Sequence, residues 1–189
     1  LAYLRPIPNL VIASPLNELD LRNLMYTGYA AFNGPFVIRY PRGKGEMKDW
    51  RNEMQVLPIG KGKKLRDGDD IAVLSIGPIG NEVIKAIEMV KEEGVSIAHY
   101  DMIYLKPLDE ELLHEIGRKY NRIITVENGV IKGGFGSAVL EFMADNGYTP
   151  HVKRIGVPDA FIEHGSIPEL YQLCGMDAES IAKQLKKEN

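Results

Sequence analysis

The fold class follows from one segment, residues 71–100, with the sequence IAVLSIGPIGNEVIKAIEMVKEEGVSIAHY. It begins with an apolar run, Ile71–Ile76, that predicts a buried strand, and its next part has the helical spacing of apolar residues from about Asn81 to Glu93. Gly94 is expected to end this helix as its C′ residue, and Val95–Tyr100 predicts another strand. A strand, a helix and a second strand in this order indicate a parallel pair joined by a right-handed crossover.

The same alternation continues to the C-terminus. Strands that alternate with helices predict an α/β fold of three layers, a mostly parallel sheet with helices on both faces. The other expected elements are a helix capped by Asp109, a strand at Arg122–Val126, a helix opened by Gly133–Ser137, a strand at Val152–Val157, a helix opened by the capping box Ser166–Glu169 with Pro168 in its first turn, and a helix capped by Asp177.

The first forty residues predict a smaller strand–helix–strand unit. Residues 10–13 and Phe36–Tyr40 are the expected strands, and Asn17 is the expected N-cap of the helix between them. Five residues share one face of this helix at helical spacing, namely Leu21, Leu24, Met25, Gly28 and Phe32. Two strands cannot bury both faces of a sheet unaided, so we expect this unit to be the tail of a domain whose remainder is absent.

Three regions are therefore expected: a partial α/β unit at residues 1–45, a linker at 46–64 and a complete domain at 65–189. The linker surrounds Trp50 with charged and amide side chains and shows no sustained periodicity. A tryptophan in such a segment is expected to pack on a neighbouring unit rather than to bind a ligand. The first residues carry neither a start methionine nor a signal-peptide core, so we expect the chain to begin mid-sequence.

Composition argues against several classes of protein. The apolar fraction of 44% and the charged fraction of 26% are those of an ordinary globular protein. A net charge of -3 gives no basic footprint for nucleic acid, and no apolar run approaches the roughly 20 residues that span a membrane. The single cysteine, Cys174, cannot form an internal disulfide, which fits a reducing cytoplasm.

Arg42 is the candidate for ligand binding. It lies in Arg39-Tyr-Pro-Arg-Gly43, just past the carboxyl end of an expected strand, where open α/β sheets bind their ligands. A guanidinium there suits a phosphate, since it offers two parallel donors. The alternative for Arg42 is an interdomain salt bridge at the start of the linker. Arg39, in the strand itself, is expected to be paired structurally.

Other polar motifs favour structural roles. The run Gly133–Gly136 opens a helix and could cradle a phosphate, but its spacing fits no known phosphate loop, so close packing is the preferred interpretation. The segment Gly60–Lys64 is expected to be a solvated turn. Glu127 ends a strand and suits either a ligand contact or a turn. His164 could face another subunit or a cleft, but a structural cap or a surface role is the preferred interpretation.

No metal or catalytic constellation is evident. The four histidines, at positions 99, 114, 151 and 164, form no pair at metal-ligand spacing, so we expect no metal site in this chain. No Ser–His–Asp or Cys–His arrangement can be placed. From the residues alone, the sequence therefore predicts an α/β domain with a candidate phosphate-binding arginine.

The order of the motifs resembles one family. The chain is similar over nearly its whole length to the C-terminal third of 1-deoxy-D-xylulose-5-phosphate synthases. The segments that carry the resemblance are Tyr3–Pro8, Met25–Tyr29, Ile38–Gly43, Leu57–Lys61, Lys106–Asp109, Thr125–Asn128, Gly133–Val139, Pro158–Gly165 and Cys174–Ala178. Lys106–Asp109 is shared with transketolases and 2-oxoacid dehydrogenase β subunits, whereas Arg39–Gly43 and Phe161–Gly165 together are much more specific.

The resemblance implies a thiamine-diphosphate enzyme that condenses pyruvate with glyceraldehyde 3-phosphate, releasing carbon dioxide, to form a precursor of isoprenoids, thiamine and pyridoxal. It implies that residues 1–45 end the pyrimidine-binding domain and that 65–189 form the transketolase-like C-terminal domain, which supports the fold and a homodimer. It further implies that the magnesium–diphosphate site and the activating glutamate precede Leu1, so this chain carries no catalytic, cofactor-binding or metal-binding residue. Arg42 matches the arginine that holds the phosphate of the aldehyde substrate.

Two rivals remain open. A β subunit of a 2-oxoacid dehydrogenase has the same fold and passes an acyl group to a lipoyl domain, which requires no phosphate-binding arginine. A non-catalytic module for dimerisation or ligand sensing is the other rival.

We predict that the 189-residue chain binds no thiamine diphosphate, because the resemblance places the cofactor's ligands before Leu1. Isothermal titration of the cofactor and Mg²⁺ into the chain should show no heat of binding. Binding at micromolar affinity would contradict this prediction.

Overall fold

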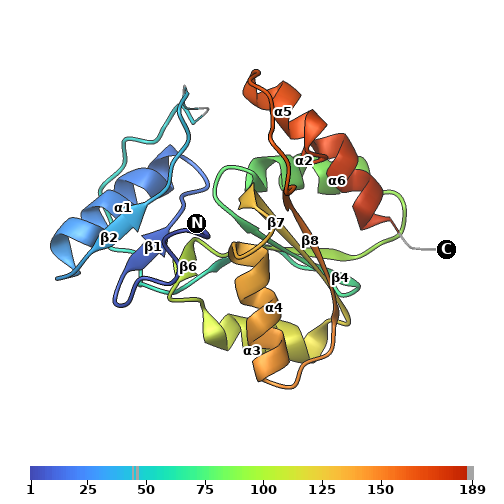
Figure 1. Cartoon of the computed structure of the whole chain (residues 1–189), viewed down its shortest axis with the longest axis horizontal. Helices are drawn as coiled ribbons and strands as arrows, with labels where there is room; N and C mark the ends of the chain where they lie inside the picture. The colour runs from blue at the N-terminus through green and yellow to red at the C-terminus, as the bar shows by residue number, and fades with distance from the viewer. Residues whose placement is uncertain (44, 46, 187–189) are drawn as a thin grey trace.

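The computed structural model describes residues 1–43, 45 and 47–186, and they form two sheets (Figure 1). The larger sheet has the strand order β3-β5-β4-β7-β8. Neighbouring strands in this sheet pair in parallel, except that β3 runs antiparallel to β5 at the edge. The five strands are β3 (Lys63–Arg66), β4 (Ile71–Ile76), β5 (Ile97–Asp101), β7 (Arg122–Val130) and β8 (His151–Val157).

Helices cover both faces of this sheet, which confirms the expected three-layer α/β fold (Figure 1). One face carries α3 (Glu110–Lys119) and α4 (Phe135–Asp145), and the other carries α2 (Gly80–Met89), α5 (Ile167–Leu173) and α6 (Ala178–Leu185). Each face has its own core. Leu113 of α3 and Phe135 of α4 are fully buried in one, whereas Val83 of α2 and Ile181 of α6 are fully buried in the other.

The smaller sheet has the order β2-β1-β6. Here β1 (Val11–Ala13) and β2 (Phe36–Ile38) pair in parallel on either side of α1 (Glu18–Ala30) in the chain, as the sequence predicts. The third strand, β6 (Tyr104–Lys106), comes from the later part of the chain and pairs antiparallel with β1. The strand β6 was not predicted, because three residues after a strand are too few to show a period of their own.

The helix caps follow the sequence closely. Asn17 accepts a hydrogen bond from the Asp20 N–H at 2.9 Å, Asp109 caps α3 and Asp177 caps α6. The expected end of α2 is wrong, because the helix stops at Met89 with Val90 as C-cap. Gly94 instead closes a separate turn with a φ of 70°, so its left-handed backbone marks the loop and not the helix end.

The buried face of α1 only partly agrees with the face that was predicted from its apolar residues. Leu24 is fully buried, but Met25 is 62% exposed, and the polar side chains of Asn23 and Thr27 are buried beside Leu24. They bind the backbone of the segment that follows β2, because Asn23 Oδ1 accepts the Gln55 N–H at 3.1 Å and Thr27 Oγ1 accepts the Leu57 N–H at 2.8 Å. Polar side chains on α1 therefore hold this irregular segment in place.

Trp50 packs over α1, in agreement with a packing role. The guanidinium of Arg22, on α1, lies 5.8 Å from the centre of the indole ring, and that of Arg51 lies 4.8 Å from it. None of the helices in the described residues combines the length and the hydropathy of a membrane-spanning segment. The domain boundaries expected at residues 45 and 64 remain predictions.

Candidate functional site

Arg42 lies beyond the carboxyl end of β2 and is exposed. Its side chain makes no hydrogen bond or ion pair with any residue in the described ranges 1–43, 45 and 47–186. No described atom lies within 4 Å of the position that a Cβ on Gly43 would occupy, so the space beside Arg42 is open. Within the described residues, Arg42 therefore does not form the interdomain salt bridge that was its alternative role.

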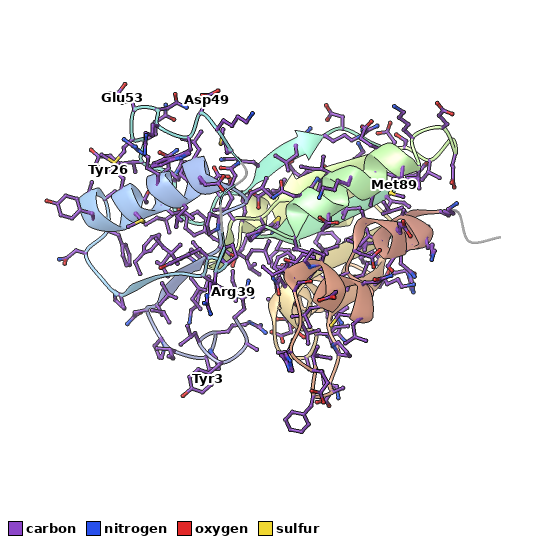
Figure 2. All side chains as sticks on the ribbon, turned by 90° about the horizontal axis from the view of Figure 1, so that it is seen from above. Tyr3, Tyr26, Arg39, Asp49, Glu53 and Met89 are labelled. Atoms are coloured by element: carbon purple, nitrogen blue, oxygen red, sulfur yellow. The ribbon has the colours of Figure 1, made fainter. Side chains whose placement is uncertain are left out.

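Arg39 occupies a different environment at the same turn. Its N–H donates to the Ala13 carbonyl at 2.8 Å, and its own carbonyl accepts the Ser14 hydroxyl at 2.8 Å. The side chain is half-buried and lies between the smaller sheet and the C-terminal helices (Figure 2). Burial lowers the pKa of Arg39, while the groups of Tyr171 and Glu127 oppose that shift. Arg39 therefore faces the larger sheet across the junction.

Glu127 is the buried acid of this edge, with 1% of its surface exposed. It lies in β7, and its carboxylate reaches the start of α4, where Oε2 accepts the Phe135 N–H at 2.9 Å and Oε1 accepts the Gly136 N–H at 2.8 Å. Burial raises the pKa of Glu127, against these two hydrogen bonds and the charge of Arg39. The carboxylate thus satisfies amides that have no partner within the helix and opposes the positive end of its dipole.

The glycines before and within α4 permit this contact. A Cβ on Gly134 would lie 2.2 Å from Glu127 Oε2, and one on Gly136 would lie 2.5 Å from Thr125 Oγ1. The run Gly133–Gly136 is therefore explained by close packing, as preferred from the sequence. The anion at this helix start is the protein's own carboxylate and not a bound phosphate.

The lysines of Gly60–Lys64 are engaged in ion pairs. Lys61 contacts the carboxylates of Asp109 and Glu111, and Lys63 contacts Asp20 at 2.6 Å. This segment therefore joins elements of the fold and does not resemble a phosphate loop in structure. The joining role was missed in the sequence, because the partners lie more than forty residues away.

The other candidates lie apart from Arg42. His164 is exposed in the loop before α5, and no described contact assigns it a function. Asn128 follows Glu127 and donates from Nδ2 to the Tyr171 hydroxyl at 2.9 Å, which ties β7 to α5. In the described residues, no group of three or more His, Cys, Asp or Glu side chains is placed to hold a metal ion.

Residues 60–181 match the family model described as "Transketolase, C-terminal domain". The chain belongs to this family. A solved chain described as "Split gene transketolase, inactive beta4 tetramer" is similar in structure, with a TM-score of 0.81 and 28% sequence identity. The similarity covers 99% of this chain and 61% of that one.

Curated relatives are more similar in sequence. A "1-deoxy-D-xylulose-5-phosphate synthase" from Parabacteroides distasonis is 98% identical over all 189 residues, and one from Bacteroides thetaiotaomicron is 62% identical. These matches confirm the resemblance to 1-deoxy-D-xylulose-5-phosphate synthases. The chain spans only about 30% of the length of these relatives.

We predict that Glu127→Gln lowers the free energy of unfolding of the transketolase-family domain by about 1–3 kcal/mol, because one buried amide loses its acceptor. Urea unfolding followed by circular dichroism measures this change. Glu141→Gln is the matched control, since Glu141 is an exposed acid paired with Arg5. Loss of this surface ion pair should lower the free energy of unfolding by less than about 1 kcal/mol. Equal effects of the two substitutions would remove the capping role of Glu127.

Proposed function

We propose that this chain is the C-terminal part of a 1-deoxy-D-xylulose-5-phosphate synthase. The longer enzyme would condense pyruvate with glyceraldehyde 3-phosphate to 1-deoxy-D-xylulose 5-phosphate and release carbon dioxide, supplying a precursor of isoprenoids, thiamine and pyridoxal. The observation that carries this proposal is the 98% identity to a protein of that name over the whole chain.

The chemistry of the reaction would belong to the part of the longer protein that this chain does not include. In such enzymes thiamine diphosphate supplies the carbanion, and Mg²⁺ holds its diphosphate. At the glycine-opened start of α4, the backbone amides are occupied by Glu127, and no described cluster of three or more His, Cys, Asp or Glu side chains is arranged for a metal. We assign no catalytic step to this chain and expect it to be inactive alone, because the resemblance places the cofactor's ligands elsewhere in the longer enzyme.

The contribution of this chain to the substrate site would be Arg42. Its guanidinium is exposed beyond the carboxyl end of β2 and has no described partner to release before it could bind an anion. A phosphate dianion would receive two parallel hydrogen bonds from it. This geometry suits the phosphate of glyceraldehyde 3-phosphate better than the uncharged end of a lipoyl group.

The longer enzyme would act as a homodimer in the cytoplasm. Exposed apolar side chains on α1, among them Met25 and Tyr29, suit burial against another part of the assembly. The single cysteine agrees with a reducing compartment.

An acceptor assay on the full-length enzyme tests the proposed reaction. Pyruvate, thiamine diphosphate and Mg²⁺ are supplied with either glyceraldehyde 3-phosphate or a lipoyl domain, and carbon dioxide and the condensed product are measured. The proposal expects deoxyxylulose phosphate with the aldehyde and no acyl transfer to lipoyl. Acyl-lipoyl formation would instead assign the parent to the 2-oxoacid dehydrogenases.

For the binding residue, we predict that Arg42→Ala in the full-length enzyme raises the KM for glyceraldehyde 3-phosphate strongly and the KM for pyruvate little. Loss of a charge-assisted phosphate contact corresponds to about 1.5–3 kcal/mol, or roughly 10- to 150-fold. Arg51→Ala is the control, because Arg51 is an exposed arginine of the same segment that packs on Trp50.

Two outcomes would overturn the assignment of Arg42. Unchanged kinetic constants in Arg42→Ala would remove it from the substrate site. A rise in the aldehyde KM for Arg39→Ala alone, with the fold retained, would move the role to the half-buried arginine of the same turn.

A further inference from the structure

Three ionisable side chains lie close together where α1 contacts the larger sheet, and we name Asp20, Lys63 and Asp101 the junction cluster. Asp20 lies on α1, Lys63 on β3 and Asp101 at the end of β5. Lys63 Nζ lies 2.6 Å from Asp20 Oδ1, and Lys63 is the partner of Asp101 in the β3–β5 register. The cluster therefore bridges the smaller unit and the C-terminal domain.

Asp101 is incompletely paired inside this cluster. It is fully buried, and its Oδ2 has no hydrogen-bond partner in the described part of the chain. Its Oδ1 accepts only a long hydrogen bond, from the Ile103 N–H at 3.3 Å. Burying an ionised carboxylate with an unpaired oxygen costs much free energy. Burying the protonated acid costs much less, because the acid is uncharged.

The backbone next to Asp101 is held in an uncommon conformation. Ile103 has a φ of 54°, a left-handed value that a β-branched residue rarely adopts. Its carbonyl accepts the Ser14 N–H at 2.8 Å, while the neighbouring Met102 N–H donates to the Ser75 carbonyl at 2.9 Å. This turn therefore fastens the two sheets to each other, and Asp101 Oδ1 is one of the groups that hold it.

The surroundings of Asp101 bring the pKa of its carboxyl close to neutral pH. Burial and then the charge of Asp20 raise the pKa of Asp101 from 3.8 to about 7, against the Ile103 N–H and Lys63. His99, two residues earlier on β5, is buried, and its pKa is lowered to about 4, so it adds no charge in this range. Tyr104 of β6 is also buried and neutral, since burial raises its pKa to about 12.

We propose that the junction cluster is a proton-controlled latch, which holds α1 and β1 against the C-terminal domain when Asp101 is protonated. Opening the junction exposes Asp101 to water, where it ionises. Between about pH 4 and pH 7, Asp101 is mostly protonated in the closed form and mostly ionised in the open form. Opening therefore becomes up to tenfold more favourable per pH unit across that window and changes no further above it.

The first test is a direct titration of Asp101 in the 189-residue chain. Side-chain ¹³C chemical shifts of labelled aspartates are followed by NMR from pH 4 to 9. The proposal expects a midpoint near 7 for Asp101, and a shift of that midpoint to lower pH in Asp20→Asn, which removes the neighbouring negative charge. A midpoint below about 5, or one that does not move in Asp20→Asn, would overturn the proposal.

The second test follows opening itself by amide hydrogen exchange, corrected for the intrinsic pH dependence of exchange. Between pH 5 and 7, the opening equilibrium of α1, β1 and β6 should rise by up to tenfold per pH unit and then level off, while that of β4 stays constant. Asp101→Asn should abolish the rise, and the exposed control Asp49→Asn should retain it. The same rise in Asp101→Asn would contradict the latch.

Discussion

The antiparallel pairing of β6 with β1 is the constraint on which the arrangement of the two sheets depends. Alone, β1 and β2 form a two-stranded parallel sheet with one helix, which cannot bury enough apolar surface to be stable. Addition of β6 makes a third strand and carries Tyr104, fully buried, into the core beneath α1. The turn before β6 is hydrogen-bonded to both sheets, so the smaller unit is fixed in place by backbone contacts from the C-terminal domain.

Two buried acids, Glu127 and Asp101, lie near this junction, and they differ in how their carboxylate oxygens are hydrogen-bonded. Glu127 has donors for both carboxylate oxygens at the start of α4 and therefore stabilises a helix terminus. Asp101 has a donor for one oxygen only and is therefore a site of proton sensitivity. Between the two sheets, Arg39 is half-buried towards Glu127, whereas Arg42 extends from the same turn into open space. One turn thus carries a half-buried arginine at the junction and an exposed one, Arg42, for which we propose the phosphate-binding role.

Much of the fold could be predicted because its signals are local. Ile71–Ile76 is a strand with the predicted bounds, and the caps at Asn17, Asp109 and Asp177 depend on side chains within a few residues of the helix they begin. The misses are non-local. The edge strand β3 is four exposed residues without alternation, β6 is three residues long, and the buried side of α1 depends on hydrogen bonds to residues 55 and 57. For the site, the position of Arg42 at a strand end was visible in the sequence. The capping role of Glu127 and the pairing of Lys63 with Asp20 required the tertiary structure.

The dependence of the smaller unit on β6 is tested most directly by dividing the chain. Isotope-labelled residues 1–59 are observed by NMR alone and after addition of unlabelled residues 60–189. Residues 1–59 should be unfolded alone and should gain dispersed signals for β1 and α1 when 60–189 is added. Dispersed, native-like signals from 1–59 alone would contradict it, because the smaller unit would then fold without its third strand.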